Sequence, residues 1–281
     1  MKKKSKLFKT ILLLITLPLF ILAVKKVIEI RKGAAGFPAN ITINTSSLQG
    51  KVPSSLWQNF SQGGEEAADM IAPIVDKVRT LQPELIRIDH LFDYYNVYQG
   101  PNNYDFSRLD SAIDSILRTG ARPMLSLFYT PASMTKNNQN ATEPQDWNNW
   151  YQLVKATARR YSVDKNISGI YYEVWNEPDL FGGWHYAKSP SYSTLYLQTA
   201  KAVAEGASNS FYKIGGPAIT AFYPAWIKSL FATVTSNRLR LDFISWHRYS
   251  KNIQDYEKDF DNLNQILSNY PAYFDIERLV T

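Results

Sequence analysis

The most informative segment of this chain is Tyr171-Tyr172-Glu173-Val174-Trp175-Asn176-Glu177-Pro178-Asp179. Residues 170–175 are β-branched, aromatic or apolar apart from Glu173, a composition typical of a strand that is covered on both faces. Pro178 cannot donate a hydrogen bond to a sheet, and it favours extended geometry for Glu177, so the strand is expected to stop there. The segment therefore predicts a buried strand with a carboxylate at its C-terminal tip.

Strand-like and helix-like segments alternate along the rest of the chain. The predicted strands are residues 56–60, 85–88, 123–128, 170–175, 213–215, 243–246 and 278–281, and the main helical patterns are residues 109–117, 147–161, 192–207 and 225–233. This alternation predicts a parallel sheet with helices outside it. The spacing of the strands suits a (β/α)8 barrel of about 250 residues, in which catalytic residues lie at the C-terminal ends of the strands.

The Asn-Glu-Pro motif has two interpretations. A polar turn between strand and loop explains it without any chemistry, because tripeptides of this kind occur by chance. The whole segment, however, resembles the acid/base strand of clan A glycoside hydrolases, in which an Asn-Glu pair ends the fourth barrel strand.

Further blocks resemble glycoside hydrolase family 39, the family of β-xylosidases and α-L-iduronidases. Residues 104–110 and 119–125 resemble its second-helix and third-strand region, residues 215–218 the end of its fifth strand, and residues 241–249 its sixth strand. The blocks follow the family's order from about Trp57 to the C-terminus. The resemblance implies a retaining hydrolase of β-linked oligo- or polysaccharides on a (β/α)8 barrel, with no cofactor and no metal.

The resemblance also implies roles for individual residues. Glu177 would be the general acid/base, and Asn176 would hydrogen-bond the 2-hydroxyl of the sugar. Arg87 would hold the nucleophile ionised. His247 and Tyr249 would contact the sugar, and Tyr249 would also orient the nucleophile. His90 and Trp184 are further candidates for contact with the substrate.

Structural explanations remain open for several of these residues. Arg87, a lone charge in an apolar strand, could form an ion pair with Glu173 or Asp89. Asn176 could be a turn former, and His247 a core histidine. Glu173 lies roughly 13 Å along the strand from the catalytic candidate, so we expect it to anchor the barrel interior rather than take part in the reaction.

The position of the nucleophile limits what the 281 residues can do alone. In the family it is a Glu directly after the apolar part of the seventh strand, which here falls just beyond Thr281. We therefore expect a truncated barrel of about seven strands that is inactive by itself, with Glu277 a surface carboxylate at the start of the last strand. The alternatives are an endo-glycanase of another clan A family, and a non-hydrolytic carbohydrate-binding protein on a broken barrel.

The N-terminal region predicts export. We expect a basic n-region at residues 1–10, a signal anchor at 11–28, a linker at 29–52 and the barrel at 53–281. An anchor is favoured over a cleaved signal peptide because no small-x-small site follows closely. The positive charge before the apolar segment predicts an extracytoplasmic catalytic part, anchored in the plasma membrane or, if cleavage occurs, secreted.

Charge and cysteine content exclude several classes of function. Residues 1–32 carry a net charge of +8, which leaves −2 for residues 33–281 out of the total of +6. The folded part has no basic stripe for phosphates, so nucleic acid is not expected as a partner. The chain has no cysteine, which excludes thiolate catalysis and disulfides, and its three histidines lack the paired spacing of metal ligands.

Overall fold

A computed structural model describes residues 58–62 and 68–281. Their main feature is a seven-stranded, wholly parallel sheet in which each strand lies beside its successor in the chain. Its strands are β1 (Asn59–Gln62), β2 (Leu85–Ile88), β5 (Arg122–Leu127), β6 (Ile170–Val174), β7 (Tyr212–Ile219), β8 (Phe243–Trp246) and β9 (Glu277–Val280). The predicted parallel sheet is confirmed.

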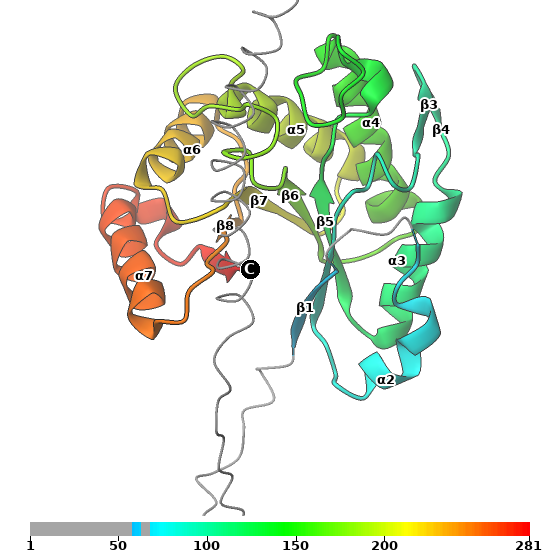
Figure 1. Cartoon of the computed structure of the whole chain (residues 1–281), viewed down its shortest axis with the longest axis horizontal. Helices are drawn as coiled ribbons and strands as arrows, with labels where there is room; N and C mark the ends of the chain where they lie inside the picture. Colours follow the sequence, from blue (N-terminus) through cyan, green and yellow to red (C-terminus); the bar gives the residue numbers. More distant parts are fainter. Residues whose placement is uncertain (1–57, 63–67) are drawn as a thin grey trace, which may run out of the picture. The chain divides into compact units, whose positions relative to one another are not determined.

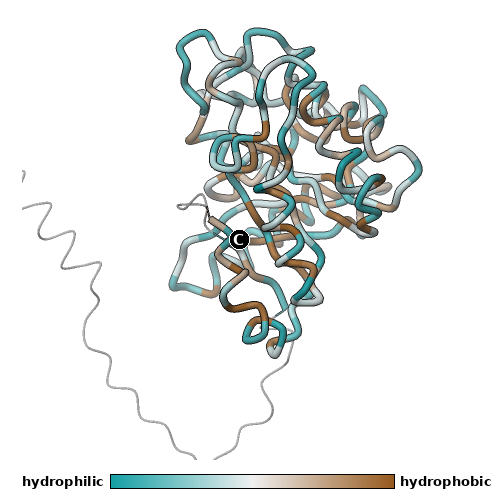
Figure 2. Tube along the Cα trace, turned by 90° about the vertical axis from the view of Figure 1, so that its right-hand side faces the viewer, coloured by the Kyte–Doolittle hydropathy of each residue, from teal (hydrophilic) through white to brown (hydrophobic). Residues whose placement is uncertain are grey.

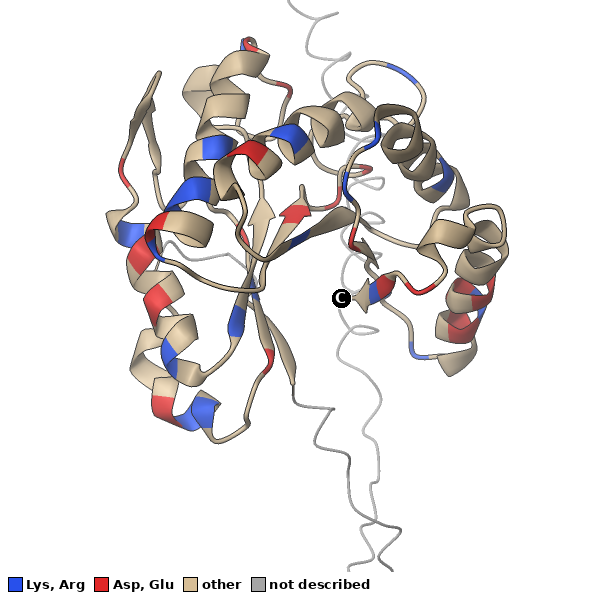
Figure 3. Cartoon of the chain, turned by 180° about the vertical axis from the view of Figure 1, so that it is seen from behind, with Lys and Arg blue, Asp and Glu red and all other residues tan. Residues whose placement is uncertain are grey.

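Helices cover the outer side of this curved sheet (Figure 1). They are α2 (Val75–Arg79), α3 (Ser107–Thr119), α4 (Trp147–Arg159), α5 (Tyr192–Ala207), α6 (Pro224–Asn237) and α7 (Ile253–Leu267). A two-stranded hairpin of β3 (Tyr98–Gly100) and β4 (Asn103–Tyr104) follows β2. Figure 3 shows charges of both signs mixed along the helices, as the charge distribution predicts for a surface without a basic stripe.

The sheet forms most of a (β/α)8 barrel but does not close within the described residues. β1 and β9 are its two edges, and each pairs with one neighbouring strand of the described sheet. A groove of 470 Å³ is lined by residues of both edge strands, among them Phe60 and Leu279. An incomplete barrel of seven strands is therefore confirmed.

No helix among the described residues is long and apolar enough to cross a membrane. The predicted n-region, signal anchor and linker, residues 1–52, lie outside the described part of the chain.

Alternate residues of β6 face two different cores. The hydroxyl of Tyr172 lies 2.8 Å from that of Ser162, in the helical turn Arg160–Asp164 that follows α4, so this side chain points toward the helices. Tyr171 points the other way because successive strand residues face opposite sides. It belongs to a separate apolar cluster with Leu85, Met124 and Phe243. Both faces of β6 are therefore buried, as its composition predicts.

Local signals fix the ends of α3. The carboxylate of Asp105 accepts a hydrogen bond from the backbone N–H of Ser107 at 2.9 Å, and Gly120 ends the helix in a left-handed conformation with φ of 93°. Between them, Leu109, Ile113 and Ile116 recur at helical spacing and are buried. Figure 2 shows the resulting alternation of apolar and polar residues along the chain.

β7 and β8 approach each other closely at Gly215. A Cβ atom on this residue would lie 2.1 Å from the carbonyl oxygen of Phe243 and 2.5 Å from its ring. Only glycine fits there.

Candidate active site

Glu177 lies directly after β6, in a tight turn. Trp175 and Glu177 have φ angles of 72° and 49°, so the expectation that Pro178 keeps Glu177 extended is wrong. The turn is held by the backbone: the N–H of Glu177 donates to the carbonyl of Ala218 at 2.8 Å, and the carbonyl of Glu177 accepts from the N–H of Phe181 at 2.7 Å. Left-handed backbone is unfavourable for such residues, and its occurrence here marks a turn that surrounding contacts enforce.

The side chain of Glu177 is paired with His247. The Nδ1 atom of His247 lies 2.7 Å from the Oε1 atom of Glu177, and both side chains are buried. His247 follows β8, and its backbone N–H donates to the carbonyl of Ile219 at 2.8 Å, which fixes the ring position. Its other ring nitrogen, Nε2, is buried without a hydrogen-bond partner among the described residues. His247 is therefore not a core histidine with all its hydrogen bonds made. Its Nδ1 atom contacts Glu177, and its Nε2 atom has no partner among the described residues.

Arg87 sits in a buried polar network. Its guanidinium donates to the carboxylate of Glu173 at 2.7 Å and of Asp89 at 3.2 Å, and to Ser126 and Asn176 at 3.2 and 2.8 Å. Burial acts to lower the pKa of Arg87, but the charges of the two carboxylates outweigh it and hold the pKa above its ordinary value. The ion pair that the sequence left open is thus present with both partners, and its contact with a nucleophile stays a prediction.

Asn176 is oriented by this network. Its Oδ1 atom accepts the 2.8 Å hydrogen bond from Arg87. Because the carbonyl oxygen of Asn176 already accepts this hydrogen bond, the amide nitrogen is the group that can donate to a sugar hydroxyl. Arg87 therefore acts on the candidate site through Asn176.

His90 belongs to an aromatic cluster beside this network. Its Nδ1 atom lies 2.8 Å from the Oδ2 atom of Asp93, and its ring stacks on Tyr94 at 4.1 Å. The ring of Tyr129 packs between His90 and Trp175, at centroid distances of 5.2 and 5.6 Å. Burial, and next the charge of Asp93, raise the pKa of Tyr129 well above its ordinary value, so it stays a neutral phenol. A direct contact of His90 with substrate stays a prediction.

The two remaining candidates differ in exposure. Trp184 is 2% exposed and packs against Trp175 and Trp147, at ring distances of 5.3 and 6.2 Å. The expected contact between Trp184 and a sugar does not fit this burial, because neither ring face is accessible. Tyr249 is 81% exposed, with its ring perpendicular to that of His247 at 6.2 Å. Tyr249 can therefore meet a substrate at the mouth of the site.

Sequence reasoning missed Asp179 as a structural part of the site. Its carboxylate accepts a hydrogen bond from the backbone N–H of Thr220 at 3.0 Å and another from the hydroxyl of the same residue. This contact ties the loop after β6 to the loop after β7. The available signal was the position of Asp179, directly after the Asn-Glu-Pro turn.

Glu173 and Glu277 lie where the sequence predicts. Glu173 is fully buried in the sheet interior and bound to Arg87. Glu277 is the first residue of β9, at the opposite end of the sheet from Glu177, and pairs with Lys213. The described residues contain no group of three His, Asp or Glu side chains placed to hold a metal ion.

Two curated proteins are similar to parts of this chain. A β-xylosidase of Geobacillus stearothermophilus is 30% identical over 189 residues, which cover 63% of this chain and 37% of that protein. A β-xylosidase of Caldicellulosiruptor saccharolyticus is 32% identical over 158 residues, which cover 52% of this chain and 31% of that protein. The chain thus spans about a third of the length of these relatives.

Solved structures share the fold. A glucosidase of Croceicoccus marinus superposes with a TM-score of 0.56 at 20% identity, covering 74% of this chain and 47% of that one. A bacterial orthologue of human α-L-iduronidase gives a TM-score of 0.54 at 18% identity, covering 80% and 41%. The profile of glycosyl hydrolases family 39 matches residues 72–272, which include β2, β6, β8 and the Glu177–His247 pair. The chain therefore belongs to glycosyl hydrolases family 39.

Proposed function

We propose that this protein is a retaining glycoside hydrolase of β-linked oligo- or polysaccharides, with Glu177 as the general acid/base. The family and the two β-xylosidase relatives support the reaction class. The single observation that carries the assignment of Glu177 is its 2.7 Å contact with His247 in a buried turn at the C-terminal ends of the strands. In barrels of this architecture, chemistry takes place at that end.

The proposed reaction moves one proton in each of two steps. In the first, Glu177 donates its proton to the glycosidic oxygen while the bond between that oxygen and the sugar breaks and a second carboxylate bonds to the sugar. In the second, water displaces that carboxylate from the sugar and gives a proton to Glu177. His247 positions the carboxyl group in both steps, and Asn176 offers its amide nitrogen to the sugar.

Retention needs a second carboxyl group about 5–5.5 Å from the first. The N–H of Thr281 donates to the carbonyl of Trp246, and the N–H of Arg248 donates to the carbonyl of Thr281, both at 3.1 Å. Thr281 is therefore paired with the residues on either side of His247. A glutamate directly after Thr281 would therefore lie next to His247. The family resemblance puts the nucleophile at the same place.

The lysine-flanked apolar segment at residues 11–28 supports an extracytoplasmic location for the enzyme, anchored in the plasma membrane. Protease added to intact cells tests this proposal: the catalytic part should be digested while a cytoplasmic marker survives. Protection of the catalytic part in intact cells would refute it.

The acid/base assignment is tested with Glu177→Gln in the gene product that contains these residues. Hydrolysis of xylobiose should fall about 10²- to 10⁴-fold. For an aryl xyloside with a good leaving group, the rate of the first step should fall much less, because that leaving group needs no proton. Added azide should then yield the β-xylosyl azide, since azide attacks without a general base. Glu277→Gln, on the opposite side of the sheet, is the control and should retain activity; equal losses in both variants would exclude the assignment.

A further inference from the structure

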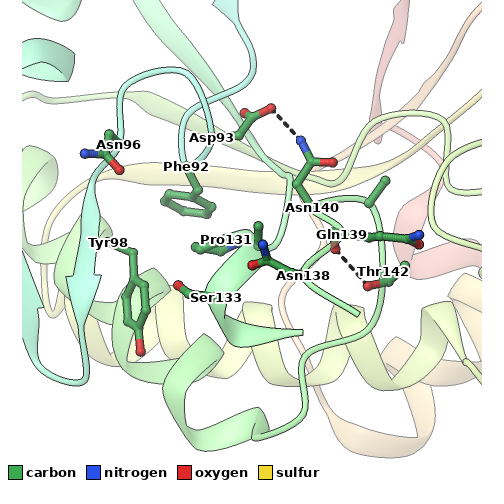
Figure 4. A pocket seen from close by; sticks show the side chains of 12 residues that line it. Phe92, Asp93, Asn96, Tyr98, Pro131, Ser133, Asn138, Gln139, Asn140 and Thr142 are labelled. Atoms are coloured by element: carbon green, nitrogen blue, oxygen red, sulfur yellow. Dashed lines mark hydrogen bonds between the residues drawn. The ribbon is translucent and has the colours of Figure 1, made fainter. Parts of the chain in front are cut away.

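A second polar pocket lies on the C-terminal side of the sheet, away from Glu177. It has a volume of 810 Å³ and is lined by the segments that follow β2 and β5 (Figure 4). This volume falls within the range of roughly 300–1,000 Å³ that small-molecule sites occupy. We call it the amide pocket, because four of its residues are carboxamides: Asn96, Asn138, Gln139 and Asn140.

Asp93 gives this pocket a buried polar atom without a partner. The Oδ2 atom of Asp93 is engaged by His90 at 2.8 Å and by the amide nitrogen of Asn140 at 3.1 Å. The Oδ1 atom is buried and has no hydrogen-bond partner among the described residues. An unpaired buried carboxylate oxygen is unfavourable, so the pocket wall holds a hydrogen-bond acceptor whose bond is not made.

The other lining groups match a sugar. Carboxamides both donate and accept hydrogen bonds, as neighbouring hydroxyls of a pyranose require. The rings of Tyr98 and Phe92 lie at the side of the pocket in Figure 4, and the partly exposed ring of Tyr98 adds apolar surface for C–H groups.

The charge of the pocket selects against acidic ligands. None of the 12 residues that line it is Lys or Arg, and its one ionisable carboxylate is Asp93. A phosphate or a uronate would meet the carboxylate of Asp93 and would find no Lys or Arg among the lining residues. The pocket therefore fits an uncharged ligand.

A chain of contacts connects the amide pocket with the candidate active site. Asp93 holds His90, the ring of His90 meets Tyr129, and Tyr129 packs on Trp175, two residues before Glu177. Both sites thus lie at the C-terminal ends of strands of the same sheet, with packed aromatic rings between them.

We infer that the amide pocket is a subsite for a neutral oligosaccharide and binds a sugar unit remote from the bond that is cleaved. This inference rests on the proposed function for its substrate class. Binding at the pocket itself needs neither Glu177 nor a nucleophile, so it can be measured separately from hydrolysis.

Two asparagines allow a test that preserves the backbone. Asn96 and Asn138 have φ angles of 51° and 54°, which glycine adopts without strain. In the full chain, Asn96→Gly combined with Asn138→Gly should weaken xylotetraose binding in calorimetry at least about tenfold, because two hydrogen-bonding groups are lost. Asn102→Gly is the matched control: its φ is 58°, it lies in the turn between β3 and β4, and it does not line the pocket. This control should bind like the unsubstituted chain.

A second variant tests the same pocket in case the double variant does not fold. Gln139→Ala removes an exposed pocket side chain and should weaken xylotetraose binding severalfold. Tetragalacturonate, an acidic tetramer, should bind at least about tenfold more weakly than xylotetraose because Asp93 repels it.

The outcomes separate the two proposals. Xylotetraose binding that both pocket variants leave unchanged, equal affinity for the acidic tetramer, or no measurable binding would each overturn the subsite. Hydrolysis that depends on Glu177 would survive that result. Binding lost in both pocket variants, with no hydrolysis in the unsubstituted protein, would uphold the subsite and remove the proposed activity.

Discussion

Glu177 and Glu277 occupy opposite ends of the same parallel sheet, and their surroundings differ in how completely polar atoms are paired. Glu277 accepts hydrogen bonds from Lys213 at 2.5 Å and Tyr171 at 2.9 Å, and Lys213 also donates to the hydroxyl of Tyr171 at 2.9 Å. At the other end, Glu177 is held by His247, whose Nε2 atom is buried and unpaired among the described residues. Pairing at one end stabilises the fold, while at the other end a buried polar atom is left without a hydrogen-bond partner among the described residues.

The largest expected effect concerns Arg87, which supports the Glu177 end of the sheet. Arg87→Leu leaves the buried carboxyl group of Glu173 without its cation. Removal of one partner from a buried ion pair destabilises a protein by about 3–5 kcal/mol. Urea unfolding followed by tryptophan fluorescence should show this loss in the free energy of unfolding.

An exposed pair provides the control for this variant. Arg159 lies 3.6 Å from Asp164, and the two side chains are 69% and 42% exposed. Arg159→Leu should change the free energy of unfolding by less than about 1 kcal/mol. A similar loss in both variants would mean that the Arg87 network does not differ from an ordinary surface pair.

A smaller effect is expected from His247, which acts on the reaction through Glu177. His247→Phe keeps a ring but loses the hydrogen bond, and kcat should fall about 10- to 100-fold, the equivalent of a hydrogen bond to a charged group. KM should change little, because the contact is with Glu177. His247→Asn should recover part of kcat, since a carboxamide can donate from near the Nδ1 position. Loss of stability with unchanged kcat in His247→Phe would assign His247 to the core instead.

The smallest effect is expected at the Glu277 end. Lys213→Met should leave kcat/KM unchanged and lower the free energy of unfolding by about 1 kcal/mol or less, because the pair is partly exposed. Burial acts to lower the pKa of Lys213, but the hydrogen bonds with Glu277 and Tyr171 outweigh it and raise the pKa above its ordinary value.

This shift fixes the pH dependence of the Lys213 contribution. A cationic group whose pKa is raised by folding stabilises the folded state. For a lysine this contribution is fully present below the pKa of the unfolded chain, about 10.4, and is lost as the pH rises through the pKa of the folded protein. The stability difference between the unsubstituted protein and Lys213→Met should therefore be constant from about pH 7 to 9 and shrink above about pH 10.5. A difference that disappears near neutral pH would show that Lys213 does not act as a cation here.

Strand and helix positions with strong composition signals were predictable from the sequence. The strands at Leu85–Ile88 and Phe243–Trp246 and the helix at Tyr192–Ala207 match the predictions residue for residue. The helix α7 (Ile253–Leu267) was missed, because most of its residues are polar and its apolar face is correspondingly narrow. The hairpin of β3 and β4 was missed as well, since strands of two or three residues carry almost no pattern.

The candidate site was predictable in its residue types but not in its contacts. The sequence brought Glu177, Asn176, Arg87 and His247 together by resemblance, and the structure places them in one connected region. It could not predict that Trp184 is buried, because an aromatic residue in a loop packs or projects according to neighbours that are distant in sequence. The backbone of Glu177 escaped prediction for the same reason: the acceptor of its N–H is Ala218, on another strand.

Gly215 has a consequence for how this sequence can change over evolutionary time. Its missing side chain lets the ring and carbonyl of Phe243 occupy the space that a methyl group would take. Every single-nucleotide change that replaces this glycine adds at least a Cβ atom and pushes β7 away from β8, and with it Ala218, which holds the turn at Glu177. Homologous sequences should therefore keep glycine at this position while the outer loops diverge. The glycine should then identify related sequences in which few other residues are conserved.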